Sequence, residues 1–187
     1  MSISPNAHAL PTAYTMLAKT LHWTVATVLT FVFLSGFAAD SASMPESSGA
    51  LRAHLAFGLS VGALTILRLA AWLTFDRRPA PVSHPVVLES VVARTTHILL
   101  YIVPLGMVIS GVAMVAVSDA APVIFGGEGD LPRFETLPPR AAHGFGASLL
   151  LALLTFHIGA ALWHQFVRRD GIMRRMGLGW LFGGSVK

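Results

Sequence analysis

The sequence predicts an all-α integral membrane protein, a four-transmembrane-helix bundle with both termini cytoplasmic and one membrane domain over residues 1–187. Of the 187 residues, 54% are hydrophobic and 12% are charged, and the mean hydropathy is +0.67. Soluble domains carry about a quarter charged residues, so the exposed surface is expected to face lipid. Four long apolar segments and an uneven distribution of Lys and Arg are the other two observations behind this prediction.

The four apolar segments have the length that a bilayer crossing requires. Residues 20–39, 95–118 and 141–167 contain no charged residue, and residues 53–75 contain only Arg68. About 20 apolar residues cross the hydrocarbon core as a helix. We expect spans at about 17–39, 51–75, 91–117 and 140–167, then a basic C-terminal tail over 168–187 that lies on the inner leaflet with Trp180 and Phe182 as anchors.

The basic residues orient the bundle. The positive-inside rule assigns the side richer in Lys and Arg to the cytoplasm. One side of the predicted topology carries nine of these residues and the other carries three, namely Lys19, Arg77, Arg78, Arg94, Arg168, Arg169, Arg174, Arg175 and Lys187 against Arg52, Arg133 and Arg140. Both termini are therefore expected inside. The same bias accounts for the net charge of +4 without nucleic acid, and the 119–139 loop on the outside is expected to hold a short helix or cover the bundle.

Histidines within the spans are the strongest functional signal, because ionisable groups at membrane depth are costly and usually functional. His143 and His157 are 14 residues apart, which on a helix gives about 21 Å of rise and about 40° of rotation. They therefore face the same side of the bundle at two depths. The starts of the second and first spans place His54 at the depth of His143 and His22 at that of His157.

Two pairs of imidazoles indicate two haem groups. The chain has no cysteine, so disulfides, thiolate sites and covalent c-type haem are excluded. Two imidazoles in apolar surroundings suit haem iron better than zinc or a di-iron carboxylate centre. Glycines beside these histidines would let a flat macrocycle approach the backbone or would serve helix packing, namely Gly58, Gly62, Gly144 and Gly146.

Two further polar residues lie in the inner half of the membrane. Arg68 follows His54 by 14 residues, and the four spans contain no acid to pair with it. A buried guanidinium requires an anion, which a haem propionate or a lipid phosphate would supply. His97 is expected at the depth of the inner pair, as a rival ligand, a quinone-facing residue or a packed side chain.

Nearly the whole chain, about residues 16–176, resembles the bacterial cytochrome b561 family. The resemblance rests on the segments TLHWTVA, LRAHLAFGLSVGALTILRL, THILLYIVPLGMVISG and AAHGFGASLLLALLTFHIGAALWH. It implies a multi-pass protein of the bacterial inner membrane that holds two haem b. The positions that match the family's ligands are His22 and His157 for the inner iron and His54 and His143 for the outer iron. The best-characterised type is a superoxide:ubiquinone oxidoreductase.

The sequence leaves three hypotheses for the function, from different classes. The first is a superoxide oxidase that passes electrons from periplasmic superoxide to membrane ubiquinone, with Arg52 and Arg140 attracting the anion and His97 or His164 donating protons near the quinone. Six acids in the outer loops oppose that attraction, namely Asp40, Glu46, Asp119, Glu128, Asp130 and Glu135. The alternative is a haem b subunit that relays electrons between a partner redox complex and quinone. A haem-free assembly protein is the third and weakest hypothesis.

Overall fold

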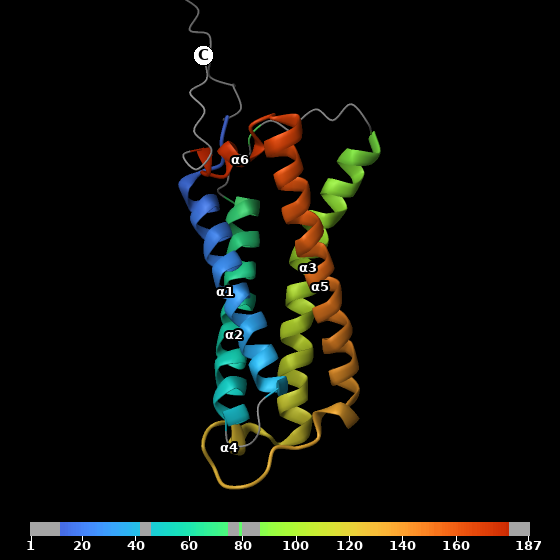
Figure 1. The fold of residues 1–187 in the computed structure, drawn as a ribbon. Coiled ribbons are helices and arrows are strands. Elements are labelled where there is room, and N and C mark those ends of the chain that lie inside the picture. The colour runs from blue at the N-terminus through green and yellow to red at the C-terminus, as the bar shows by residue number, and fades with distance from the viewer. Residues whose placement is uncertain (1–11, 42–45, 75–78, 80–86, 180–187) are drawn as a thin grey trace, which may run out of the picture.

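The computed structural model describes residues 12–41, 46–74, 79 and 87–179, and all regular structure in that part of the chain is helical. Four long helices lie side by side along one axis (Figure 1). They are α1 (Met16–Ser41), α2 (Glu46–Thr74), α3 (Val87–Ser118) and α5 (Pro138–Trp163), and α5 continues through a π-helical turn, η2 (His164–Arg168). Each is long and apolar enough to cross a membrane, which confirms the predicted all-α bundle of four membrane-spanning helices.

The helices extend beyond the predicted spans by one to five residues at most ends. The second begins at Glu46 rather than at 51, and the third begins at Val87 rather than 91. The prediction followed the uncharged runs, whereas a helix continues past the hydrocarbon into polar sequence. Glu89 lies in the first turn of α3, where a negative charge is favourable.

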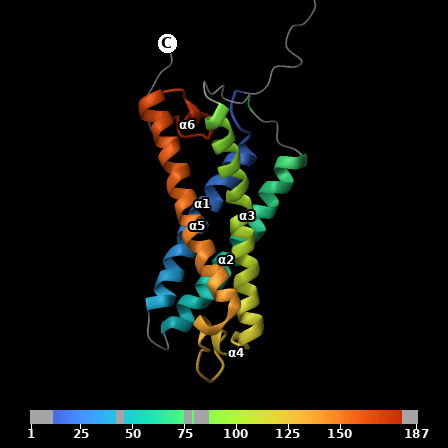
Figure 2. The same cartoon turned by 90° about the vertical axis from the view of Figure 1, so that its right-hand side faces the viewer.

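The bundle consists of two helical hairpins. The backbones of α1 and α2 pack closely along each other, as do those of α3 and α5, and the two hairpins meet mainly where α2 contacts α3. The pairs α1–α5 and α2–α5 are not among the closely packed helices of the described chain. Figure 2 shows α5 crossing in front of α1 and α2 on this open side. Contacts between α5 and the α1–α2 hairpin are therefore made by side chains and not by closely packed backbones.

The outer surface of the bundle is suited to lipid. Large apolar side chains are exposed along every long helix, such as Leu34, Ile66, Ile109 and Phe156. Exposed hydroxyls are satisfied within their own helix, because Ser60 donates to the carbonyl of Ala56 and the hydroxyls of Thr30, Ser35 and Thr155 likewise donate to the carbonyl four residues earlier. Lipid offers no partner for a free hydroxyl, so these bonds are what a lipid-facing surface requires.

A buried apolar layer crosses the middle of the bundle. Leu29, Val61 and Leu150 form its core, with Phe33, Val103 and Leu154 packed against it. The buried Pro104 supplies the matching position on α3. Leu150 lies seven residues, or two helical turns, from both His143 and His157, so the layer divides the bundle into two polar levels.

The two ends of the bundle differ. We call the end that carries the short helix α4 (Ala121–Ile124) the outer end and the end that carries α6 (Ile172–Arg175) the inner end (Figure 1). The 119–139 loop holds α4 and a 3-10 turn, η1 (Phe134–Thr136), as expected, and Ile124 is 0% exposed. The described part of the predicted tail folds back at the inner end. Its anchors Trp180 and Phe182 lie outside the described residues, as does the end of the second predicted span at residue 75.

Candidate haem sites

The outer level brings His54 and His143 together. Their ring centroids are 6.0 Å apart and their planes cross at 74°. The Nδ1 atom of His54 is 2.9 Å from the carbonyl oxygen of Val32 on α1. A carbonyl can only accept, so Nδ1 carries the proton and Nε2 keeps a free lone pair. This hydrogen bond is the usual way in which proteins fix the tautomer of a metal-binding histidine.

His143 is held in the same tautomer by Ser110. The Ser110 hydroxyl donates to the carbonyl of Met107 at 3.0 Å, and its oxygen lies 2.9 Å from Nδ1 of His143. Because its proton is already engaged, the hydroxyl accepts from Nδ1–H, which leaves Nε2 of His143 unprotonated. Both outer imidazoles are therefore held by α1 and α3 with one nitrogen available as a ligand.

Two glycines make room for these rings. A methyl group at Gly36 would lie 3.0 Å from the His54 ring, and one at Gly111 would lie 3.4 Å from the His143 ring. Of the two roles expected for the glycines beside the site, Gly62 and Gly146 fit helix packing, since Gly62 packs against Val108 and Gly146 against Met107, while Gly144 approaches Arg140 of its own helix. Of the four, Gly58 alone leaves open space as expected, because a methyl group there would have no neighbour within 4 Å.

The inner level contains three histidines. His157 lies between His22 at 6.3 Å and His97 at 5.2 Å, measured between ring centroids. Nδ1 of His97 lies 2.6 Å from the carbonyl of Ala93, one turn earlier in its own helix. His22 is different, because its Nδ1 is buried and has no hydrogen-bond partner among the residues that the structure describes. A buried imidazole nitrogen without a partner is costly, so a bound group would complete the environment of His22.

Arg68 joins this inner level. Its charge acts on both His22 and His157, and its guanidinium carbon lies 5.2 Å from the centroid of the Tyr101 ring. Within the described residues no carboxylate forms an ion pair with it. The arginine therefore has one aromatic neighbour and still lacks the anion that its burial favours.

The two levels repeat along each long helix with a spacing of 14 residues. On α5 the repeat is His143 and His157, and on α2 it is His54 and Arg68. On α1 and α3 it runs from a histidine at the inner level to a glycine at the outer level, as His22 to Gly36 and His97 to Gly111. The midpoints of these four intervals are the buried residues Leu29, Val61, Pro104 and Leu150.

The two arginines expected to attract a substrate have different partners. Arg140 donates to Asp40 at 3.1 Å, in an ion pair whose side chains are 35% and 72% exposed. Arg52 places Nε 3.4 Å from the backbone oxygen of Ser48 and is exposed at the outer end. His97 lies at the inner level beside His157, as expected from its depth, and so away from the outer end that carries the two arginines.

The donor set fits haem. An imidazole nitrogen binds a first-row metal at about 2 Å, so two imidazoles on one iron have ring centroids roughly 6 Å apart, close to the separations of both predicted pairs. Each pair supplies two imidazole nitrogens, which would suit a haem iron held between two histidines and fall short of the four ligands of a tetrahedral zinc site. A haem iron would give the His22 imidazole a binding partner, and a propionate would give the Arg68 guanidinium an anion. Among the described residues, His22 Nδ1 lacks a hydrogen-bond partner and Arg68 lacks a carboxylate.

A four-helix membrane bundle with paired interior histidines defines the class of membrane-bound b-type cytochromes. The comparison with protein families assigns the chain within it: the family model described as prokaryotic cytochrome b561 matches residues 13–179. The chain therefore belongs to the prokaryotic cytochrome b561 family, and it is a bacterial multi-pass membrane protein that binds haem b and transfers electrons. A comparison with curated proteins found no match.

Several residues of the site could not be identified from the sequence alone. Ser110 and the Val32 carbonyl orient the outer imidazoles, and Tyr101 covers Arg68. None of these contacts has a local sequence signal, because each joins different helices. Gly36 and Gly111 did have one, namely their spacing of 14 residues from His22 and His97.

Proposed function

We propose that this chain is a di-haem b oxidoreductase of the bacterial inner membrane that passes electrons from periplasmic superoxide to ubiquinone. The observation that carries the proposal is the stacking of two imidazole pairs on either side of one apolar layer. His54 and His143 hold the outer iron, and His22 and His157 hold the inner iron. The positive-inside rule supports an outer end that faces the periplasm.

The chain's own residues hold the cofactors and control access. Each bound haem supplies a one-electron redox centre, with the protein setting its ligation and burial. His54 and His143 present Nε2 because Val32 and Ser110 hold their Nδ1–H groups. Leu29, Val61 and Leu150 exclude water between the two levels. Arg68 offers its guanidinium to a propionate at the inner level, and His97 or His164 supplies protons to the quinone.

Ser110→Ala tests the hydrogen bond that orients His143. Removing the hydroxyl deletes the hydrogen bond between Ser110 and Nδ1–H of His143, and losses of this kind cost about 10- to 100-fold in metal affinity. We expect haem to dissociate faster from the outer site in a competition assay with apomyoglobin, with the inner site unchanged. Ser148→Ala is the matched control, since that hydroxyl bonds only the Gly144 carbonyl of its own helix. Equal loss from both variants would contradict the assigned role of Ser110.

Superoxide is an anion, so its approach is expected to depend on charge at the outer end. Arg52→Glu should slow reduction of the outer haem by roughly three- to tenfold at low salt, with a smaller effect at high salt. Stopped-flow absorbance after mixing with superoxide measures this rate. Reduction from the quinone side should change less, because no anion has to reach the outer end.

The Arg140–Asp40 ion pair gives a second charge test. Arg140→Glu and Asp40→Asn both break this ion pair, yet they change the outer charge in opposite directions. We expect the first to slow superoxide oxidation and the second to accelerate it about twofold. If both variants slow it equally, the pair acts through structure, and superoxide is not steered by Arg140.

The relay subunit is the second candidate. It is favoured by the neutralisation of Arg140, because Asp40 removes one of the cations expected to attract superoxide. In that case electrons enter from a partner redox protein that docks on the bundle. Mixing the purified protein with superoxide and ubiquinone separates the two functions. Quinone reduction that is abolished by superoxide dismutase supports the oxidase, and its absence in a fully haem-loaded protein favours the relay.

A further inference from the structure

The inner end of the bundle contains a compact polar segment that the proposed electron path does not use. After η2, residues 169–179 turn back over the start of α1, on the side where α6 lies (Figure 1). Two left-handed positions, Arg169 at φ 53° and Gly171 at φ 75°, reverse the chain direction. We call residues 169–178 the return segment.

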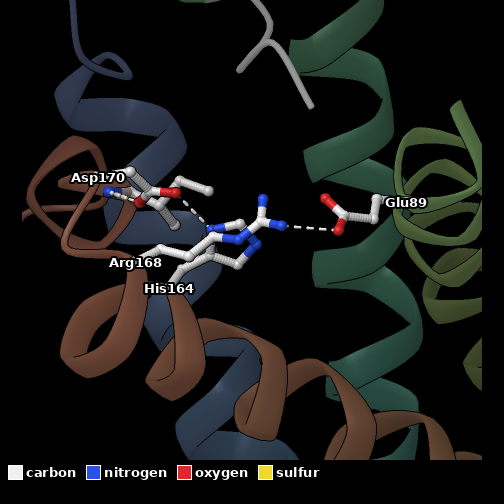
Figure 3. Close-up of polar contacts among 5 residues, drawn as sticks. Glu89, His164, Arg168 and Asp170 are labelled. Atoms are coloured by element: carbon white, nitrogen blue, oxygen red, sulfur yellow. Dashed lines mark hydrogen bonds and ion pairs between the residues drawn. The ribbon is translucent and has the colours of Figure 1, made fainter. Parts of the chain in front are cut away.

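The return segment is fixed to the end of α5 by Asp170. One carboxylate oxygen accepts a hydrogen bond from Nδ1–H of His164, and the other accepts one from the backbone N–H of Ile172 at 3.2 Å (Figure 3). Burial opposes ionisation of Asp170, but these hydrogen bonds and the charges of His164 and Arg168 outweigh it and lower the pKa of Asp170. The carboxylate therefore stays ionised at neutral pH and holds η2 against α6.

The neighbouring Arg168 holds the same end of α5 to α3. Its guanidinium donates to the Glu89 carboxylate at 2.7 Å, on the far side of His164 from Asp170 (Figure 3). The end of α5 is thus anchored on two sides before the chain turns back. The contacts toward α1 are made by the return segment.

The far side of the return segment is attached to α1. After α6, Gly177 at φ 91° closes a Schellman motif, in which the N–H groups of Gly177 and Leu178 bond the carbonyls of Arg174 and Met173. This motif leaves the Met176 carbonyl to accept from the indole N–H of Trp23 at 3.0 Å. The backbone N–H of Tyr14 also donates to the carbonyl of Arg175, at 3.2 Å.

These contacts connect the two helices that carry the inner pair. Trp23 follows His22 directly, and their rings meet edge to face at 5.1 Å. His164 follows His157 by seven residues, two turns further along α5. Within the described chain the backbones of α1 and α5 do not pack closely, so their spacing at this end depends on side-chain contacts and on the return segment. The outer end has its own connection between the same helices, the Arg140–Asp40 ion pair.

We propose that Trp23 is a positioning residue, which acts through the return segment to set the spacing between His22 and His157 and so the stability of the inner haem. The inference rests on the proposed ligand pair. Trp23 touches neither iron nor quinone in this role. Its indole N–H holds Met176, and Asp170 holds the other end of the same segment.

The absence of cysteine allows a direct distance measurement. Spin labels on introduced cysteines at Leu17 and Leu162 report the inner spacing of α1 and α5, and labels at Phe37 and Phe145 report the outer spacing, all four being exposed positions. Double electron–electron resonance is then recorded for the full-length chain in the wild-type background, in Trp23→Phe and in Asp170→Ala. Trp163→Phe, an exposed tryptophan at the end of α5, and Asp130→Ala, in the outer loop, are the matched controls.

Both test variants should broaden the inner distance distribution and leave the outer one unchanged. They should also release the inner haem roughly two- to tenfold faster, which is the change in rate expected from the loss of one hydrogen bond. An unchanged inner distribution would overturn the proposal, as would equal broadening at both ends. A wild-type protein that lacks the inner haem would instead contradict the proposed function, and the distance measurement on that protein would still decide whether Trp23 and Asp170 set the spacing.

Discussion

Alanine at His54 or at His143 is expected to remove one haem from the protein and leave the other in place. Each variant deletes half of the outer pair, whose rings lie 6.0 Å apart, and a single imidazole does not retain a six-coordinate low-spin iron. His22→Ala and His157→Ala should remove the other haem. Pyridine haemochromogen quantification and low-temperature spectra of each purified variant measure the loss.

The spectra also decide how the histidines pair. His54→Ala and His143→Ala should deplete the same α-band component, and His22→Ala and His157→Ala should deplete the other. Depletion of different components by His54→Ala and His143→Ala would contradict the outer pair.

His97→Ala is the matched test at the inner level, because His97 lies nearer to His157 than His22 does. We expect His97→Ala to keep two low-spin haems. If it loses the inner haem while His22→Ala keeps both, the inner ligand is His97.

Arg68→Leu is expected to insert normally and to weaken the inner haem. Leucine removes a cost of about 2.5–3.5 kcal/mol for arginine near a helix centre, so expression in the membrane should not fall. Without the guanidinium a propionate loses a charge-assisted partner, and we expect about a tenfold loss of affinity or a lower midpoint potential, where tenfold in a one-electron equilibrium corresponds to about 59 mV.

The control for Arg68 is Arg94→Leu, which removes an exposed cation from the inner end of α3. It should leave both midpoint potentials unchanged in a potentiometric titration. If Arg68→Leu also leaves haem content and potential unchanged, the guanidinium interacts with lipid phosphate and Tyr101 alone.

The sequence predicted what depends on periodicity along one helix. The spacing of His143 and His157 gave two levels, and the positions of His22 and His54 within their spans gave their depths, which the structure reproduces as neighbouring rings. Contacts between helices could not be predicted in this way. The hydrogen bond from His143 to Ser110 and that from Trp23 to Met176 depend on how hairpins pack and where the chain turns back.

The same distinction explains the charges. Arg52 and Arg140 look equivalent in sequence, since each lies just before a histidine at an outer helix end. Only the structure distinguishes them, because Asp40 at the end of α1 reaches Arg140, 100 residues away, while Arg52 approaches a backbone oxygen one turn earlier in its own helix.

The most direct test of the central claim is the haem stoichiometry of the purified, monodisperse protein. Pyridine haemochromogen absorbance, divided by protein concentration from amino-acid analysis, gives the number of haem b per 19.9 kDa chain. Two imidazole pairs at two levels predict two haems per chain with two resolved low-spin signals in electron paramagnetic resonance. A value of one, with a single low-spin signal in a fully loaded protein, would contradict a di-haem path through this bundle.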